Sequence, residues 1–182
     1  MLGCDFRCIY ANINKILRIV MAAVTIIMGS ASDEEKVAPC TQVLKSLGID
    51  FYLTVSSAHR TPKRTAEIVA EQEKLGTKVF ICAAGMAAHL AGVVASQTLC
   101  PVIGVPVASG SLQGLDALFS TVQMPTGFPV ATVAIGGAKN AAFLAAQILA
   151  INDVALREKL IQKRESMAIE VANIGDELAK KY

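Results

Sequence analysis

The stretch VTIIMGSASD, residues 24–33, decides the fold class of this 182-residue chain. Its first five residues are mostly β-branched and apolar, which is typical of a strand buried on both faces of a parallel sheet. Gly29 and Ser30 end that strand, and a helical pattern over 33–47 follows directly. A buried strand that leads through a short polar turn into a helix is the repeating unit of an α/β fold.

The same alternation continues along the chain. We expect further strands at 49–55, 78–83, 102–105 and 130–134, and helices at 62–75, 87–98 and 139–151. Gly48 and Gly76 are placed to end the first two helices. Because parallel strands need crossover connections, the sequence predicts a doubly wound parallel sheet with helices on both faces, a three-layer α/β/α domain.

The apolar composition of the chain raises the possibility of a membrane-spanning helix, but the distribution of its Gly and Pro residues argues against one. Hydrophobic residues make up 53% of the chain and charged residues only 18%, which excludes a disordered protein. Residues 79–115 contain no Asp, Glu, Lys or Arg, but Gly and Pro interrupt the stretch repeatedly. It holds no uniformly apolar window of about 20 residues, as a spanning helix would need. We therefore expect the apolar residues to lie in a covered sheet and in contacts between copies of the chain.

Charge and cysteine content exclude further classes. The formal net charge of +2 is too weak for a nucleic-acid surface. The five cysteines show neither a CxxC pair nor metal-ligand spacing, so we expect buried, reduced thiols in a cytoplasmic protein. They are Cys4, Cys8, Cys40, Cys82 and Cys100.

The two ends of the chain differ from its middle. Residues 1–20 do not join the strand pattern, whereas Met21 opens a plausible natural start of a single domain over 21–182. An upstream start codon, an organellar presequence and an extra helix are all compatible with the first segment. The other end predicts a helix at about 153–180, because apolar residues recur there on one stripe. That stripe favours packing on a neighbour such as another subunit; it comprises Leu160, Met167, Val171, Ile174 and Leu178.

Ligands of parallel α/β sheets bind at the carboxyl ends of strands, so the loops there are the candidate site. After the first strand, Ser32 and Glu35 have the spacing of a capping box. The same loop could instead present hydroxyl and N–H groups to a phosphate. Three carboxylates at 33–35 crowd a bare phosphate, and Asp33 suits ribose hydroxyls better.

The loop after the second strand, SSAHRTP at 56–62, is the more informative one. Thr61 is placed to cap the next helix and Pro62 to occupy its first position. Arg60 offers a charge-assisted fork for a phosphate or carboxylate, and His59 can exchange a proton near neutral pH. This combination at the end of a strand predicts a site for an anionic small molecule.

The loop after the third strand, AAGMAAHLAG at 83–92, is built from small residues that let a ligand touch the backbone. His89 within it suits either a helix surface at an interface or catalysis. Residues 106–114 read as a flexible loop. The sequence contains no Walker loop, GxGxxG, HExxH or zinc pattern, so we expect no ATP, redox cofactor or metal.

Together the segments GSASD, SSAHRTP, AGMAAHLAG, PVIGVPV and SLQGLDALFSTVQMPTGFPVATVAIG resemble the PurE family, over about residues 22–170. Members of the class that this sequence resembles are 5-(carboxyamino)imidazole ribonucleotide mutases of purine (IMP) biosynthesis. The resemblance implies a flavodoxin-like domain, a cytoplasmic homo-octamer with sites at subunit junctions, and an isomerase without cofactor. It also implies transfer of a carboxylate from the exocyclic nitrogen to ring carbon 4, by decarboxylation and recarboxylation.

The resemblance also implies roles for individual residues. His59 matches the proton shuttle, and His89 lies in the loop around the base and the carbon dioxide. Asp33 matches the ribose-binding carboxylate. The substrate-binding residues that the resemblance implies are Ser30, Ser32, Asp33, Ser57, Ala58, Arg60, Ala84, Gly85, Ala87, Ala88 and Leu90.

The sequence departs from the family pattern in two places. The third loop usually reads AGGAAHLPG, but Met86 and Ala91 replace its second Gly and its Pro, which bears on the dynamics of the loop. The segment at 136–140 is also shorter than the corresponding segment in the commoner members of the family. Two alternative functions are a class II carboxylase, which uses aminoimidazole ribonucleotide and free carbon dioxide, and a non-catalytic ligand-binding domain of the same fold.

Overall fold

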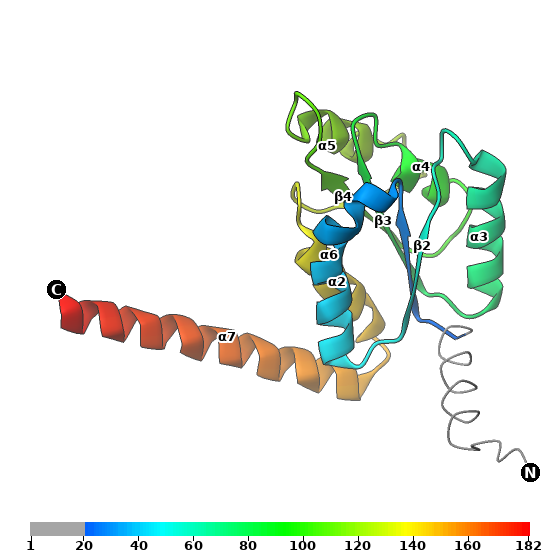
Figure 1. The fold of residues 1–182 in the computed structure, drawn as a ribbon. Helices are drawn as coiled ribbons and strands as arrows, with labels where there is room; N and C mark the ends of the chain where they lie inside the picture. The colour runs from blue at the N-terminus through cyan, green and yellow to red at the C-terminus, as the bar shows by residue number, and fades with distance from the viewer. Residues whose placement is uncertain (1–20) are drawn as a thin grey trace, which may run out of the picture.

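The computed structural model describes residues 21–182, and its centre is a five-stranded parallel sheet (Figure 1). The strand order is β2-β1-β3-β4-β5. The strands are β1 (Val24–Met28), β2 (Phe51–Val55), β3 (Val79–Gly85), β4 (Val102–Val107) and β5 (Ala131–Thr132). All residues of β1 and β4 are buried, as expected of strands covered on both faces.

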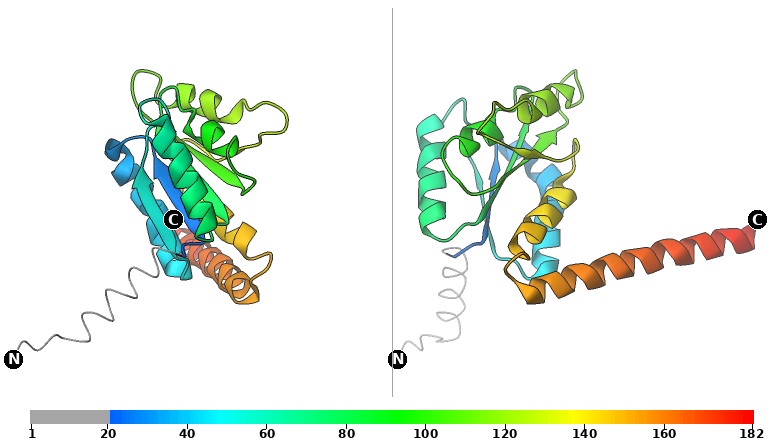
Figure 2. Two further views of the ribbon diagram at one scale, coloured as in Figure 1. Left: turned by 90° about the vertical axis from the view of Figure 1, so that its right-hand side faces the viewer. Right: turned by 180° about the vertical axis from the view of Figure 1, so that it is seen from behind.

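Helices cover both faces of this sheet, so the predicted doubly wound α/β fold is confirmed (Figure 2). The helical elements are η1 (Ala31–Asp33), α2 (Glu34–Leu47), α3 (Pro62–Lys74), α4 (Leu90–Ala95), α5 (Leu115–Val122), α6 (Ala138–Leu149) and α7 (Val154–Lys181). On one face α2 and α6 pack over Ile26, Ile81 and Ile103, and on the other α3 and α4 pack over Ile27 and Phe80.

Three local expectations were wrong. The helix predicted at 87–98 begins only at Leu90, because residues 86–89 form a turn in which Met86 has a φ of 57°. Helix α5 was not predicted, since Leu115, Phe119 and Val122 are exposed while its buried residues are Ala117 and Thr121. The large apolar residues of α5 therefore do not mark the face of the helix that packs on the sheet. Strand β5 has two residues rather than five.

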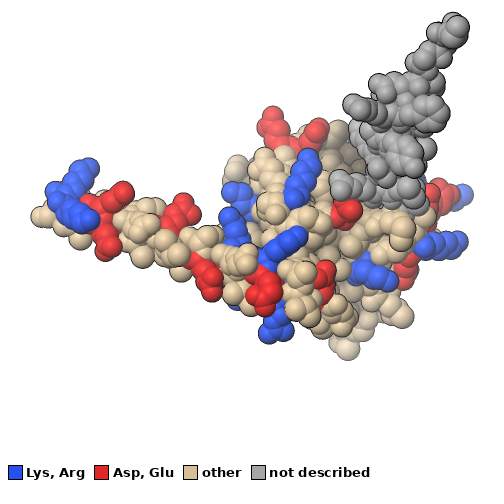
Figure 3. Space-filling view, turned by 90° about the horizontal axis from the view of Figure 1, so that it is seen from below, with Lys and Arg blue, Asp and Glu red and all other residues tan. Residues whose placement is uncertain are grey.

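The expectation of buried, reduced cysteines is met by two of the three described ones, because Cys100 is a free thiol that is only half-buried. Cys40 and Cys82 are buried free thiols, and burial raises the pKa of the Cys40 thiol to about 12 and that of Cys82 further. Cys4, Cys8 and the expectations for residues 1–20 lie outside the described residues. Basic and acidic side chains are interspersed on the face shown in Figure 3. Within residues 21–182 no helix is long and apolar enough to cross a bilayer.

Helix α7 projects from the body of the molecule (Figure 1). Leu156 in its first turn is its one buried residue, and Leu160 packs against the core. Farther along, Met167, Val171 and Ile174 are exposed. The predicted C-terminal helix is confirmed, and its packing on a neighbouring subunit stays a prediction.

Candidate functional site

A cavity of about 530 Å³ lies at the carboxyl ends of β1, β2 and β3, the expected position for a ligand in this fold. Every site residue predicted from the sequence lines it. The lining also includes three residues that were not predicted. The full set is Gly29, Ser30, Ser32, Asp33, Ser57, Ala58, His59, Arg60, Ala84, Gly85, Met86, Ala87, Ala88, His89, Leu90 and Ser109.

The loop after β1 presents two hydroxyl groups and a carboxyl to the cavity. Ser30 Oγ accepts a hydrogen bond from the Ser32 backbone N–H at 3.3 Å, and the two serine hydroxyls lie 2.9 Å apart. The predicted capping box is wrong, because the 3-10 turn η1 precedes α2 and makes Asp33 its N-cap, without a side-chain cap bond. Ser30 Oγ caps η1 instead, and both serine hydroxyls lie beside the cavity.

Asp33 is the buried carboxyl of the site. Burial raises its pKa above the ordinary value, and the nearby Lys36 ammonium and the Ser30 backbone N–H offset part of that rise. The ionised carboxyl is therefore less favourable in the folded protein than in water.

We expect Asp33→Asn to raise the melting temperature of the ligand-free protein at pH 7. A raised folded pKa penalises the folded state at pH values above it, and the penalty disappears below the unfolded value of about 3.9. The gain in melting temperature from Asp33→Asn should therefore decrease as the pH falls from above the folded pKa of Asp33 to below its unfolded pKa. Thermal unfolding across pH measures it, with the exposed Glu34→Gln as control. A gain independent of pH would contradict the assignment.

The loop after β2 is held by hydrogen bonds among its own polar groups. Thr61 precedes α3 and Pro62 occupies its first position, as predicted, but Thr61 makes no side-chain cap bond. Its hydroxyl instead accepts from the Ser57 N–H at 3.1 Å and donates to the Ser57 carbonyl at 3.0 Å. The Arg60 N–H and Nε–H both point to Ser57 Oγ, at 3.3 and 3.4 Å. This closed loop holds Ser57 and Arg60 together and leaves His59 exposed.

The loop after β3 brings the second histidine to the first. Two tight turns, Ala88 N–H to Met86 O at 2.8 Å and His89 N–H to Ala87 O at 2.9 Å, carry the chain from the strand to α4. His89 is half-buried at the N-cap of that helix. Its ring centroid lies 3.9 Å from that of His59, at an interplanar angle of 51°. The sequence left the role of His89 open, and the structure places it in contact with His59.

Met86 is the residue of this loop with an unfavourable backbone. Its φ of 57° lies in the left-handed region, where a Cβ atom is strained. We expect Met86→Gly to be more stable than Met86→Ala by up to about 1 kcal/mol, because only glycine removes that strain. The side chain is 61% exposed, so both variants lose little burial. Denaturant unfolding of the pair measures the difference, and equal stabilities would show that the turn is unstrained.

Gly29, Met86 and Ser109 are the lining residues that sequence reasoning missed. Ser109 comes from the loop after β4, two residues beyond the strand end. Its position at a strand's carboxyl end was the available signal, but the loop holds no charged residue to draw attention. Within residues 21–182 no group of three or more His, Cys, Asp or Glu side chains is arranged to hold a metal ion.

Comparisons with known proteins identify the family of this chain. The AIR carboxylase family model matches residues 23–170. N5-carboxyaminoimidazole ribonucleotide mutase of Saccharolobus solfataricus is 52% identical over 83% of this chain and 96% of that protein. The mutase of Escherichia coli is 47% identical over 85% of this chain and 93% of that protein.

Solved structures give the same family. The crystal structure of Treponema denticola PurE superposes with a TM-score of 0.79 at 32% identity, covering 85% of this chain and 97% of that chain. A crystal structure of a PurE2 variant from the same organism also superposes with a TM-score of 0.79, at 31% identity and over 85% and 96% of the two chains. This chain belongs to the AIR carboxylase (PurE) family.

Proposed function

We propose that this protein is an isomerase of purine biosynthesis, which converts 5-(carboxyamino)imidazole ribonucleotide to 4-carboxy-5-aminoimidazole ribonucleotide. The observation that supports it most is the contact between His59 and His89 beside a cavity whose other lining residues are apolar or small, or carry hydroxyl, Asp and Arg side chains. Relatives about half identical over most of their length carry the name of this mutase. The family domain spans residues 21–182 in this proposal.

The polar end of the cavity suits a ribose phosphate. Arg60 supplies a fixed positive charge with several donors, and Ser57 Oγ orients it. The paired hydroxyls of Ser30 and Ser32 add donors to the phosphate. The buried Asp33 carboxyl then accepts from ribose hydroxyls, which offsets the cost of its burial.

The apolar end suits a reaction that passes through carbon dioxide. The carbamate C–N bond breaks, and its electron pair stays on the nitrogen, which takes up a proton. Carbon 4 of the imidazole then attacks the carbon dioxide, and His59 accepts the proton that this carbon loses. The net change moves the carboxylate from nitrogen to carbon and a proton from carbon to nitrogen, so no external reactant is consumed.

Small residues around the ring serve this route in two ways. Ala87, Ala88 and Gly85 offer little to hydrogen-bond, so they enclose carbon dioxide without admitting water. Confinement next to the ring also replaces covalent activation by a high effective concentration. This chemistry requires neither a metal nor an organic cofactor.

Two assays on the purified protein test the proposal. The rate with the carbamate substrate should far exceed the rate with aminoimidazole ribonucleotide plus bicarbonate. A clear preference for the second pair would make the protein a direct carboxylase, the class II alternative. Binding of the ribonucleotide without turnover of either pair would make it a ligand-binding domain.

We further propose that the protein acts in the cytoplasm as a homo-octamer. Exposed apolar side chains on α5 and along α7 support association between copies, because large apolar surfaces are rarely left in water. Phe119 on α5 is 59% exposed and Val171 on α7 is 70% exposed. Light scattering at micromolar concentration should report eight chains, and a stable monomer would contradict the proposal.

A further inference from the structure

One polar atom of the cavity is unexplained by the contacts in the rest of the described chain. Ser109 Oγ is buried, and within residues 21–182 it has no hydrogen-bond partner. Ser109 nevertheless lines the same cavity as His59 and Arg60. A buried hydroxyl without a partner destabilises a protein, so such a group calls for an explanation, and a substrate would supply one.

The fold places Ser109 far from Arg60 within the cavity. Ser109 follows β4, and Arg60 follows β2; β1 and β3 lie between these strands. Neighbouring strands are about 4.8 Å apart, and Ser109 packs against Gly85 at the end of β3, so about 10 Å separates it from the end of β2 across the sheet. A ribonucleotide with its phosphate at Arg60 therefore directs its imidazole toward the Ser109 side.

The Ser109 hydroxyl is also held in place. It packs against Gly85, the last residue of β3, so closely that a Cβ atom at position 85 would collide with it. The Nζ of Lys36, in the first turn of α2, donates to the carbonyl of Ala108 at 2.5 Å and ties this loop to the body. The donor is thus fixed before the substrate arrives, which lowers the entropy cost of binding.

We propose that Ser109 Oγ donates a hydrogen bond to the carboxylate of the bound ribonucleotide. This inference rests on the proposed function. Ala84, Ala87 and Ala88 of the enclosing loop carry no side-chain donor for that carboxylate, and the His89 ring of the same loop lies against His59. The bond weakens when the carboxylate leaves as neutral carbon dioxide, so Ser109 positions the carboxylated ground states and acts on affinity more than on turnover.

The test compares Ser109→Ala with wild type on two ligands, by calorimetry. The ligands are the carboxylated product, 4-carboxy-5-aminoimidazole ribonucleotide, and aminoimidazole ribonucleotide, which lacks the carboxylate. We expect the Kd of the carboxylated ligand to rise about 10- to 100-fold, as loss of a hydrogen bond to a charged group would cause. The Kd of the second ligand should stay unchanged. Ser111→Ala is the matched control, an exposed hydroxyl of the same loop outside the cavity.

Other outcomes overturn the inference. Equal losses for both ligands would move the contact to the part they share, and no loss would remove the contact altogether. A lower melting temperature of Ser109→Ala would indicate a structural role, because removing an unpartnered hydroxyl should leave it unchanged or raised. If wild type converts the carbamate and Ser109→Ala binds the carboxylated ligand as tightly as wild type does, this inference alone is rejected. Wild type that converts no substrate would reject the proposed function.

Discussion

His59→Asn should lower kcat for the carbamate substrate by about 10²- to 10⁴-fold, the usual contribution of a positioned acid–base group. The amide of Asn fills similar space but cannot take up the proton that carbon 4 releases. Affinity for aminoimidazole ribonucleotide should survive, because Arg60, Asp33 and the serine hydroxyls are untouched. Steady-state kinetics and calorimetry on the same preparation separate the two effects.

The matched control for this variant is His89→Asn. Its ring contacts His59, so it changes the same neighbourhood while leaving the exposed histidine in place. We expect a smaller loss of kcat from His89→Asn than from His59→Asn. Turnover retained by His59→Asn would reject His59 as the proton shuttle, and an equal loss in both variants would assign the proton transfer to the pair.

Arg60→Met should raise KM for the ribonucleotide about 100-fold with a smaller change in kcat, because in the proposed site the guanidinium binds the phosphate and does not touch the reacting atoms. The KM of Arg60→Lys should lie between the values of wild type and Arg60→Met, since Lys keeps the charge and loses the planar fork. The KM of each variant measures the effect. Affinity for the corresponding ribonucleoside, which carries no phosphate, should be the same in wild type and Arg60→Met.

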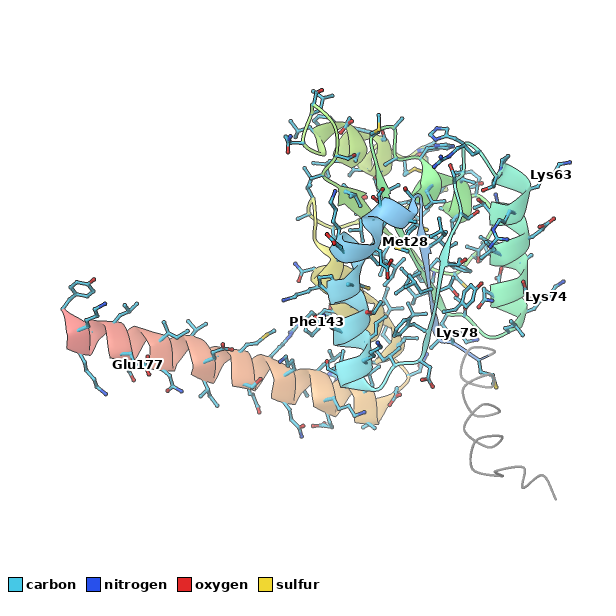
Figure 4. All side chains as sticks on the ribbon, in the orientation of Figure 1. Met28, Lys63, Lys74, Lys78, Phe143 and Glu177 are labelled. Atoms are coloured by element: carbon cyan, nitrogen blue, oxygen red, sulfur yellow. The ribbon has the colours of Figure 1, made fainter. Side chains whose placement is uncertain are left out.

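Lys63→Met is the control for the loss of a positive charge. Lys63 lies in the first turn of α3 and projects away from the sheet (Figure 4). It does not line the cavity. A comparable rise of KM in Lys63→Met would show that general electrostatic attraction, rather than a contact of Arg60, holds the phosphate.

The fold could be predicted from the sequence where an apolar run has a single physical explanation, namely burial in the sheet. The run VTIIM is wholly buried in an interior strand of the sheet, so its apolar side chains reflect that environment directly. The polar loops after the strands could be located for the same reason, since strand order alone brings their side chains to one edge.

The features that sequence reasoning missed depend on tertiary contacts. Helix α5 carries Leu115 and Phe119 on its outer face, so its apolar pattern marks a surface that no other part of residues 21–182 covers. The start of α4 is set by a left-handed Met86, a conformation that Met rarely adopts. Ser109 became a candidate only when its hydroxyl was found buried without a partner.

The projection of α7 has a consequence for where its order comes from. Within residues 21–182 most of this helix gains little packing, because Leu156 is its one buried residue and Leu160 is only partly buried against the core. Helices that receive so little tertiary packing are marginal in water. If copies of the chain pack on its distal half, as proposed above, backbone protection there should rise with protein concentration. Amide hydrogen exchange along α7 would then report association of the chain with other molecules rather than the folding of a single chain.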